Sequence, residues 1–181
     1  VADVSGKGIK SSLLMSKASS LYRCLSKTIF SASTLIKILN DEICETTTRG
    51  MFVTMIVGVY DKNKNELLLS NAGHEPPLIF SKEGNFKTID EAGPPLGIAP
   101  NFKFTEQTIS FKESSMYIFT DGITEMKNSN GEMLGQEGFQ DYIKKYQSTP
   151  NNKRLQKMIE DLIGSGRIQK DDLTIVTVDG K

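Results

Sequence analysis

The hydrophobic pattern of this chain changes its period near residue 50, and that change constrains the fold more than any other feature. Upstream, apolar residues recur at the spacing of amphipathic helices. Downstream, residues 51–60 form a nearly continuous apolar and β-branched run, which is typical of a strand covered on both faces. Helices followed by a run of antiparallel strands indicate the α+β class, in which helices cover a sheet or a pair of sheets.

Two helices are expected before the change. Helical spacing predicts the first over 9–28, with an apolar stripe of Ile9, Leu13, Leu21, Leu25 and Ile29. Residues 31–34 offer capping side chains, and a second stripe follows at Leu35, Ile36, Leu39 and Ile43. Because the connection is short, we expect the two helices to form an antiparallel pair.

Strands and further helices are expected after the change. The strands lie at 51–60, 66–71, 77–80, 86–89, 102–109, 116–120 and 173–178. A short helix is expected around 139–146 and a longer one over 155–163. Thr149 is predicted to cap the longer helix, with Pro150 at its first helical position.

Composition excludes several classes of protein. Residues 1–181 read as a single domain, in which 22 basic residues balance 22 acidic ones, so a nucleic-acid partner is not expected. No apolar run approaches the ~18 residues of a membrane span, and no secretory signal is evident, so we expect a cytoplasmic location. Cys24 and Cys44 lack C-x-x-C spacing and are expected to be reduced, packed thiols. A single histidine, His74, argues against a histidine-based zinc site.

Three aspartates stand at the ends of expected strands: Asp3, Asp121 and Asp171, the last followed by Asp172. Carboxylates at strand ends can be held rigidly and point into a shared cleft. A cluster of carboxylates usually needs cations, and oxygen ligands select hard ions such as Mg²⁺ or Mn²⁺. Taken one at a time, each aspartate is more readily a turn or cap residue, and spacing alone does not show that they converge.

Other candidate residues leave alternatives open. The segment 5–8 contains two glycines but does not match the P-loop pattern, and Lys7 either attracts a phosphate or is simply solvated. Ser5 has no histidine base nearby in the sequence, which weakens a nucleophile assignment. His74 is either a histidine bonded to backbone in a hairpin corner, which we favour, or a proton donor to a leaving alkoxide.

Six motifs occur in a fixed order along the chain. They are D-V-S-G-K-G at 3–8, M-F-V-T at 51–54, N-A-G-H-E-P-P at 71–77, P-L-G-I at 95–98, T-D-G-I-T-E at 120–125 and D-D-L-T at 171–174. Together they resemble the bacterial PPM phosphatases of the sporulation stage II E (SpoIIE) type, which include the RsbU-like stress regulators. The resemblance covers essentially the full chain and implies a four-layer αββα sandwich of antiparallel sheets flanked by helix pairs.

The resemblance also implies a chemistry. It predicts hydrolysis of phosphoserine or phosphothreonine on a protein by a water activated by two Mn²⁺ or Mg²⁺ ions, without a covalent enzyme intermediate. By resemblance, Asp3 bridges the two ions and Val4 offers its backbone carbonyl. Asp121 and Asp171 complete the metal-binding and catalytic set, and the role of Asp172 stays open.

The partners follow from the same resemblance. The substrate is expected to be a phosphorylated anti-sigma-factor antagonist, and a sensor or receiver domain is expected upstream. Members of the family carry a further acidic motif on their first strands, so we expect this chain to be truncated at its N-terminus. The truncation would weaken metal binding and expose a sheet edge for self-association. Two alternatives stay open: a catalytically weak phosphoprotein-binding or interaction module, and a hydrolase of small phosphoesters.

Overall fold

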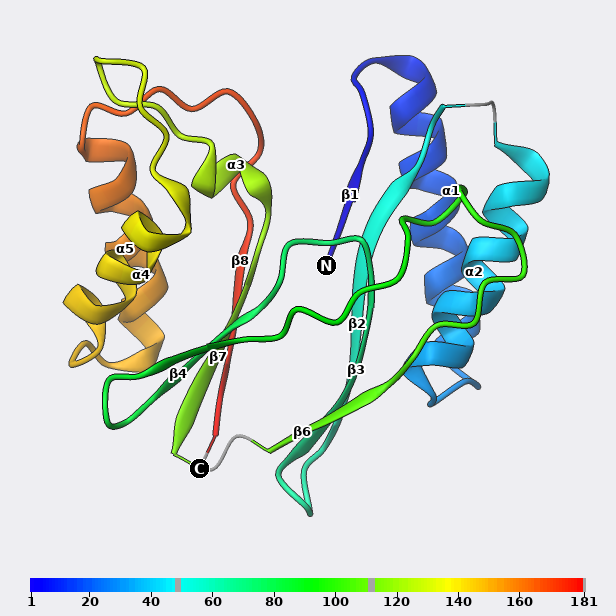
Figure 1. The fold of residues 1–181 in the computed structure, drawn as a ribbon, viewed down its shortest axis with the longest axis horizontal. Coiled ribbons are helices and arrows are strands. Elements are labelled where there is room, and N and C mark those ends of the chain that lie inside the picture. The colour runs from blue at the N-terminus through cyan, green and yellow to red at the C-terminus, as the bar shows by residue number, and fades with distance from the viewer. Residues whose placement is uncertain (48–49, 111–112, 181) are drawn as a thin grey trace.

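The computed structural model describes residues 1–47, 50–110 and 113–180. Within them, two antiparallel sheets lie face to face between two layers of helices (Figure 1). The α+β class and the αββα arrangement implied by the motifs are therefore confirmed. Each helix pair covers the outer face of one sheet, and the inner faces of the sheets pack on each other.

The first sheet has the order β1-β2-β3-β6. Its strands are β1 (Ala2–Val4), β2 (Val53–Asp61), β3 (Glu66–Ala72) and β6 (Gln107–Ser110). The second sheet has the order β5-β4-β7-β8. Its strands are β4 (Leu78–Ser81), β5 (Phe86–Thr88), β7 (Ser114–Phe119) and β8 (Ile175–Asp179). Strands β1 and β8 thus each lie at one end of a sheet.

Helices α1 (Ile9–Leu25) and α2 (Ala32–Thr46) run antiparallel over the first sheet, as expected from their short connection (Figure 1). Helices α4 (Gly135–Tyr146) and α5 (Asn151–Gly164) cover the second sheet. A single helical turn, α3 (Asp121–Thr124), follows β7 directly. The sequence pattern did not predict this turn, because four residues carry no periodicity.

Strand β2 shows why the apolar run near residue 50 is nearly continuous. Val53, Met55 and Val57 belong to the core under α1 and α2. Ile56, between them, belongs to the core that separates the two sheets. Since successive strand residues point to opposite faces, both faces of β2 are buried and both must be apolar.

The first helix differs from its predicted stripe. It ends at Leu25 rather than residue 28, and Ile9 and Leu13 are 81% and 67% exposed. The packed positions are Leu14, Ala18, Leu21 and Leu25, which keep helical spacing but are shifted around the axis. The predicted stripe was therefore wrong at Ile9 and Leu13. The stripe of α2 is confirmed, since all four of its residues are buried.

Two boundaries in the second half of the chain were also wrong. Residues 102–106 do not join β6, because the ring of Phe104 turns into the core beneath the helices before the chain reaches β3. Thr149 does not cap α5; Pro150 holds the N-cap position with ψ 138°, and the helix begins at Asn151. An extended ψ at proline excludes it from the first helical turn.

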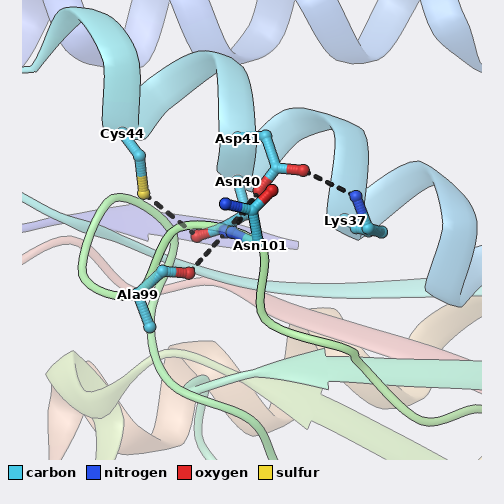
Figure 2. Close-up of polar contacts among 6 residues, drawn as sticks. All are labelled: Lys37, Asn40, Asp41, Cys44, Ala99 and Asn101. Atoms are coloured by element: carbon cyan, nitrogen blue, oxygen red, sulfur yellow. Dashed lines mark hydrogen bonds and ion pairs between the residues drawn. The ribbon is translucent and has the colours of Figure 1, made fainter.

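Polar contacts fasten α2 to the loop that contains the 95–98 motif (Figure 2). The fully buried Asn40 donates to the Ala99 carbonyl at 2.8 Å and accepts from the Gly97 N–H at 3.2 Å. Asp41 accepts from the Asn101 N–H at 2.8 Å. A buried amide with both ends paired is stabilising, and here it holds the loop against the helix layer.

Within the described ranges, no helix is long and apolar enough to cross a membrane. Cys24 and Cys44 are both free, as expected. Cys24 is exposed, however, so the prediction that both thiols are packed was wrong for it. The exposed position fits a solvent-facing site on α1, away from the stripe that contacts the sheet.

Candidate metal centre

The three aspartates singled out by sequence line one cleft of about 1130 Å³, together with Val4. Asp3 lies in β1, Asp121 opens α3 at the end of β7, and Asp171 lies in the loop before β8. The first sheet thus supplies one carboxylate and the second sheet the other two. The cleft is lined by residues at one end of each sheet, which is why residues so distant in sequence converge.

The turn after Asp3 is fixed by Ser5. Its N–H donates to the Phe52 carbonyl at 2.9 Å, and its Oγ accepts from the Phe52 N–H at 2.8 Å. Ser11, at the start of α1, donates to the Ser5 carbonyl at 3.1 Å. Ser5 therefore holds the 3–8 motif against the 51–54 motif by hydrogen bonds. These bonds give Ser5 a structural role, and no nucleophilic role is needed to explain its place.

Two other motifs meet at the opposite side of the cleft. Thr120 Oγ1 donates to the Asp172 carbonyl and accepts from the Thr174 N–H, both at 3.1 Å. Gly122 lies so close that a Cβ there would be 2.3 Å from the Asp172 carbonyl oxygen. The T-D-G and D-D-x-T motifs therefore contact each other directly. This contact places Asp121 beside Asp171 and Asp172.

The charges in the cleft repel one another. Burial raises the pKa of the Asp3 carboxyl above its usual value, and the negative charges of Asp121, Asp171 and Asp172 raise it further. The sum of these effects outweighs the opposing hydrogen bond from Val4. Ionisation of Asp3 is therefore less favourable in the protein alone than in water, which is the situation that a bound cation relieves.

The pKa of Asp171 is shifted in the opposite direction, below its usual value. The Asp172 N–H, which donates to its Oδ1 at 3.0 Å, and the ammonium of Lys7 hold the pKa of this carboxyl below its usual range. Lys7 Nζ lies 3.1 Å from Asp171 Oδ2 and 3.2 Å from the Lys170 carbonyl oxygen. Both side chains are at least half exposed, so this pair contributes little to stability, but it brings a positive charge into the cleft.

The donor set fits a hard divalent ion. The carboxylates that line the cleft are oxygen ligands of the kind that Mg²⁺ and Mn²⁺ prefer. Among residues 1–47, 50–110 and 113–180, no three histidine, cysteine or carboxylate side chains lie close enough to hold one ion together. One or two carboxylates per ion, with water as the remaining ligands, is the usual arrangement for Mg²⁺.

One acidic residue near the centre was missed from the sequence. Glu75 has a raised pKa because of burial, with further contributions from the charges of Asp121 and Glu125. It follows His74 in the N-A-G-H-E-P-P motif, in the loop between β3 and β4, and it does not line the cleft itself. Only its position in the fold reveals this, since the residue carries no periodic signal.

His74 is a buried structural residue, as we favoured, but it lies in the crossover from β3 to β4 rather than in a hairpin corner, and its imidazole contacts the side chain of Thr54 rather than backbone. It is 4% exposed, and its backbone N–H donates to Asn71 Oδ1 at 2.8 Å. It does not line the cleft, although its Nδ1 lies 3.1 Å from the hydroxyl of Thr54, which does. A direct proton donor to a leaving group would have to reach the cleft, so the position of the imidazole argues against that role.

The chain is similar to known phosphatases. It is 28% identical to phosphoserine phosphatase RsbU of Bacillus subtilis (strain 168) over 181 residues, 98% of this chain and 54% of that protein. The chain thus spans about half the length of this relative.

Solved structures agree in fold. The SiaA-PP2C domain of Pseudomonas aeruginosa has a TM-score of 0.82 at 15% identity, over 99% of this chain and 73% of that one. The PP2C phosphatase domain of SpoIIE from Bacillus subtilis was solved with a fragment of its regulatory domain. Its TM-score is 0.77 at 18% identity, over 97% of this chain and 52% of that one. Beyond the fold, the family model described as "Stage II sporulation protein E (SpoIIE)" matches residues 1–181 in full. The chain, with its aspartates gathered in one cleft of a PP2C sandwich, therefore belongs to the SpoIIE family.

Proposed function

We propose that this chain is the catalytic part of a metal-dependent protein phosphatase that hydrolyses phosphoserine or phosphothreonine. The observation that carries the proposal is the convergence of Asp3, Asp121 and Asp171 on one cleft, where Asp3 is repelled by its neighbours. An oxygen-lined cleft with excess negative charge is suited to divalent cations rather than to a naked phosphate.

Each residue has a distinct task in this proposal. Asp3 and the Val4 carbonyl hold ions from the first sheet, while Asp121 and Asp171 hold them from the second. When bound, Mn²⁺ or Mg²⁺ supplies an activated water and neutralises the phosphoryl oxygens. Lys7, in the same cleft, offers a positive charge to the incoming phosphate.

Relatives support the choice of metal. The RsbX structure is described in complex with magnesium, and the catalytic domain of PstP in complex with two manganese ions. Both share the fold of this chain at low identity. We therefore propose two ions of Mn²⁺ or Mg²⁺ here, held by Asp3, Val4, Asp121 and Asp171.

For the substrate we propose a phosphorylated protein of the anti-sigma-factor antagonist type. The support is the family and the relative named phosphoserine phosphatase. Regulation by an upstream sensor or receiver domain and a cytoplasmic location belong to the same proposal. Self-association through a sheet edge stays a prediction.

The test is Mn²⁺-dependent release of phosphate from a phosphorylated antagonist protein. Asp121→Asn and Asp171→Asn should each lower the rate at least about 100-fold, since each removes a charged ligand. Asp141→Asn is the matched control, because Asp141 lies on α4 outside the cleft and only pairs with the exposed Lys144. Equal rates for the wild type and Asp121→Asn would overturn the metal assignment.

The same assay separates the alternatives. Release from a small phosphoester at the same rate as from the phosphoprotein would favour a hydrolase of small phosphoesters. Tight binding of the phosphoprotein without phosphate release at saturating Mn²⁺ would favour a binding module.

A further inference from the structure

His74 lies at the junction of the two sheets. Its Nδ1 is 3.1 Å from Thr54 Oγ1, which belongs to β2 of the first sheet. His74 itself belongs to the loop that connects β3 of the first sheet to β4 of the second. With 4% of its surface exposed, the residue is a buried polar group placed between two layers that otherwise meet through apolar side chains.

On the first sheet, Thr54 links His74 to Asp3. Thr54 is the direct cross-strand partner of Asp3, and its Oγ1 lies 3.4 Å from the Asp3 carbonyl oxygen. Whichever nitrogen of the imidazole carries the proton, the same hydroxyl contacts both His74 and the backbone of Asp3. A shift of His74 would therefore be felt by the strand that carries the Asp3 carboxylate.

The other nitrogen of the imidazole gives the ring no second anchor. In the part of the chain that the structure describes, His74 Nε2 is buried without a hydrogen-bond partner. The contact of Nδ1 with Thr54 is therefore the one that ties the ring to the first sheet.

The loop that carries His74 is itself tightly held. Asn71 accepts from the His74 N–H at 2.8 Å and donates to the His74 carbonyl at 3.0 Å. Gly73 has φ +68°, and a Cβ there would lie 2.6 Å from the ring of Pro95. A residue so constrained from both sides can act as a rigid spacer.

We propose that His74 is a positioning residue, which holds the strand of Asp3 in place for metal binding through its contact with the hydroxyl of Thr54. The inference rests on the proposed metal site. It assigns His74 a task in metal binding that it performs without touching the ions or the substrate. Groups that orient metal ligands from behind typically change metal affinity by about 10- to 100-fold when they are altered.

The test is Mn²⁺ affinity, measured by titration calorimetry on the folded protein. His74→Phe keeps the ring but removes both nitrogens, and Thr54→Val removes the hydroxyl while conserving shape. Each should weaken Mn²⁺ binding about 10- to 100-fold, and the double variant should be no weaker than the worse single one. His74→Asn places a polar atom near the position of Nδ1 and should recover most of the affinity.

Asn40→Ala is the control for a purely structural effect. Asn40 is a fully buried, fully paired amide of α2, so its loss destabilises the protein while leaving the junction intact. It should leave Mn²⁺ affinity within twofold of the wild type. If His74→Phe and Thr54→Val both bind Mn²⁺ as the wild type does, the positioning role is wrong while the phosphatase proposal stands. If the wild type binds no Mn²⁺, both proposals fall together.

Discussion

Gly122 and Asp172 are in backbone contact on one side of the cleft, and no side chain larger than hydrogen fits between them. A Cβ at Gly122 would lie 2.3 Å from the Asp172 carbonyl oxygen, well inside any real contact distance. Thr120 fixes the same segment through its hydroxyl, 3.1 Å from that oxygen. The position of Asp121 relative to Asp171 therefore depends on the absence of a side chain at residue 122.

Gly122→Ala should force the 171–174 segment away from α3. We expect a loss of about 1–3 kcal/mol in the free energy of unfolding, together with weaker Mn²⁺ binding. Denaturant unfolding and calorimetry measure the two effects. Gly164→Ala is the control, because a Cβ at Gly164, in α5, meets nothing within 4 Å and should be neutral or slightly stabilising. Wild-type stability in Gly122→Ala would contradict the close contact.

Asp3→Asn should have opposite effects with and without metal. Because burial and the charge of Asp121 raise the pKa of Asp3, ionising this carboxyl as pH rises costs stability in the metal-free protein. The neutral amide should therefore raise the melting temperature in EDTA at pH 7. Added Mn²⁺ at 100 times its Kd should stabilise the wild type by about 2.7 kcal/mol but leave the variant nearly unchanged. Equal stabilisation of both proteins by Mn²⁺ would exclude Asp3 as a ligand.

His74 should make the fold sensitive to mild acid. Burial lowers the pKa of His74 from 6.5 to about 4. Between pH 6.5 and pH 4, the imidazole is therefore protonated in the unfolded chain but neutral in the folded protein. Its contribution to stability is complete above pH 6.5 and is lost as pH falls toward 4, a change of about 3 kcal/mol. His74→Phe should flatten this part of the curve of unfolding free energy against pH. Curves that stay parallel would show that the imidazole titrates normally.

Asp179→Asn should destabilise the second sheet and its helix layer. Asp179 Oδ1 lies 2.7 Å from the guanidinium of Arg154, whose side chain is 6% exposed. Removing one partner leaves a buried charge unpaired, which costs about 3–5 kcal/mol. Lys82→Gln is the control, since its pair with Glu113 is exposed and should contribute less than about 1 kcal/mol. Similar losses in the two variants, measured by denaturant unfolding, would contradict the difference in burial.

Much of the fold could be predicted because burial imposes periodicity. The continuous apolar run of β2 indicated a strand with two buried faces, and the stripe of α2 was confirmed at every position. Predictions failed where periodicity is ambiguous or absent. Ile9 and Leu13 fit a helical stripe as well as Leu14 does, and only packing against the sheet chose between them.

The sequence by itself determined the class of fold, the order of its elements and the identity of the acidic candidates, because these depend on local pattern and on motifs read in order. Only the tertiary structure decided that Asp3 and Asp121 line one cleft, since they lie on different sheets and spacing in sequence does not bring them together. It also decided the place of His74, because its buried contact with Thr54 exists only once the loop after β3 has packed against β2.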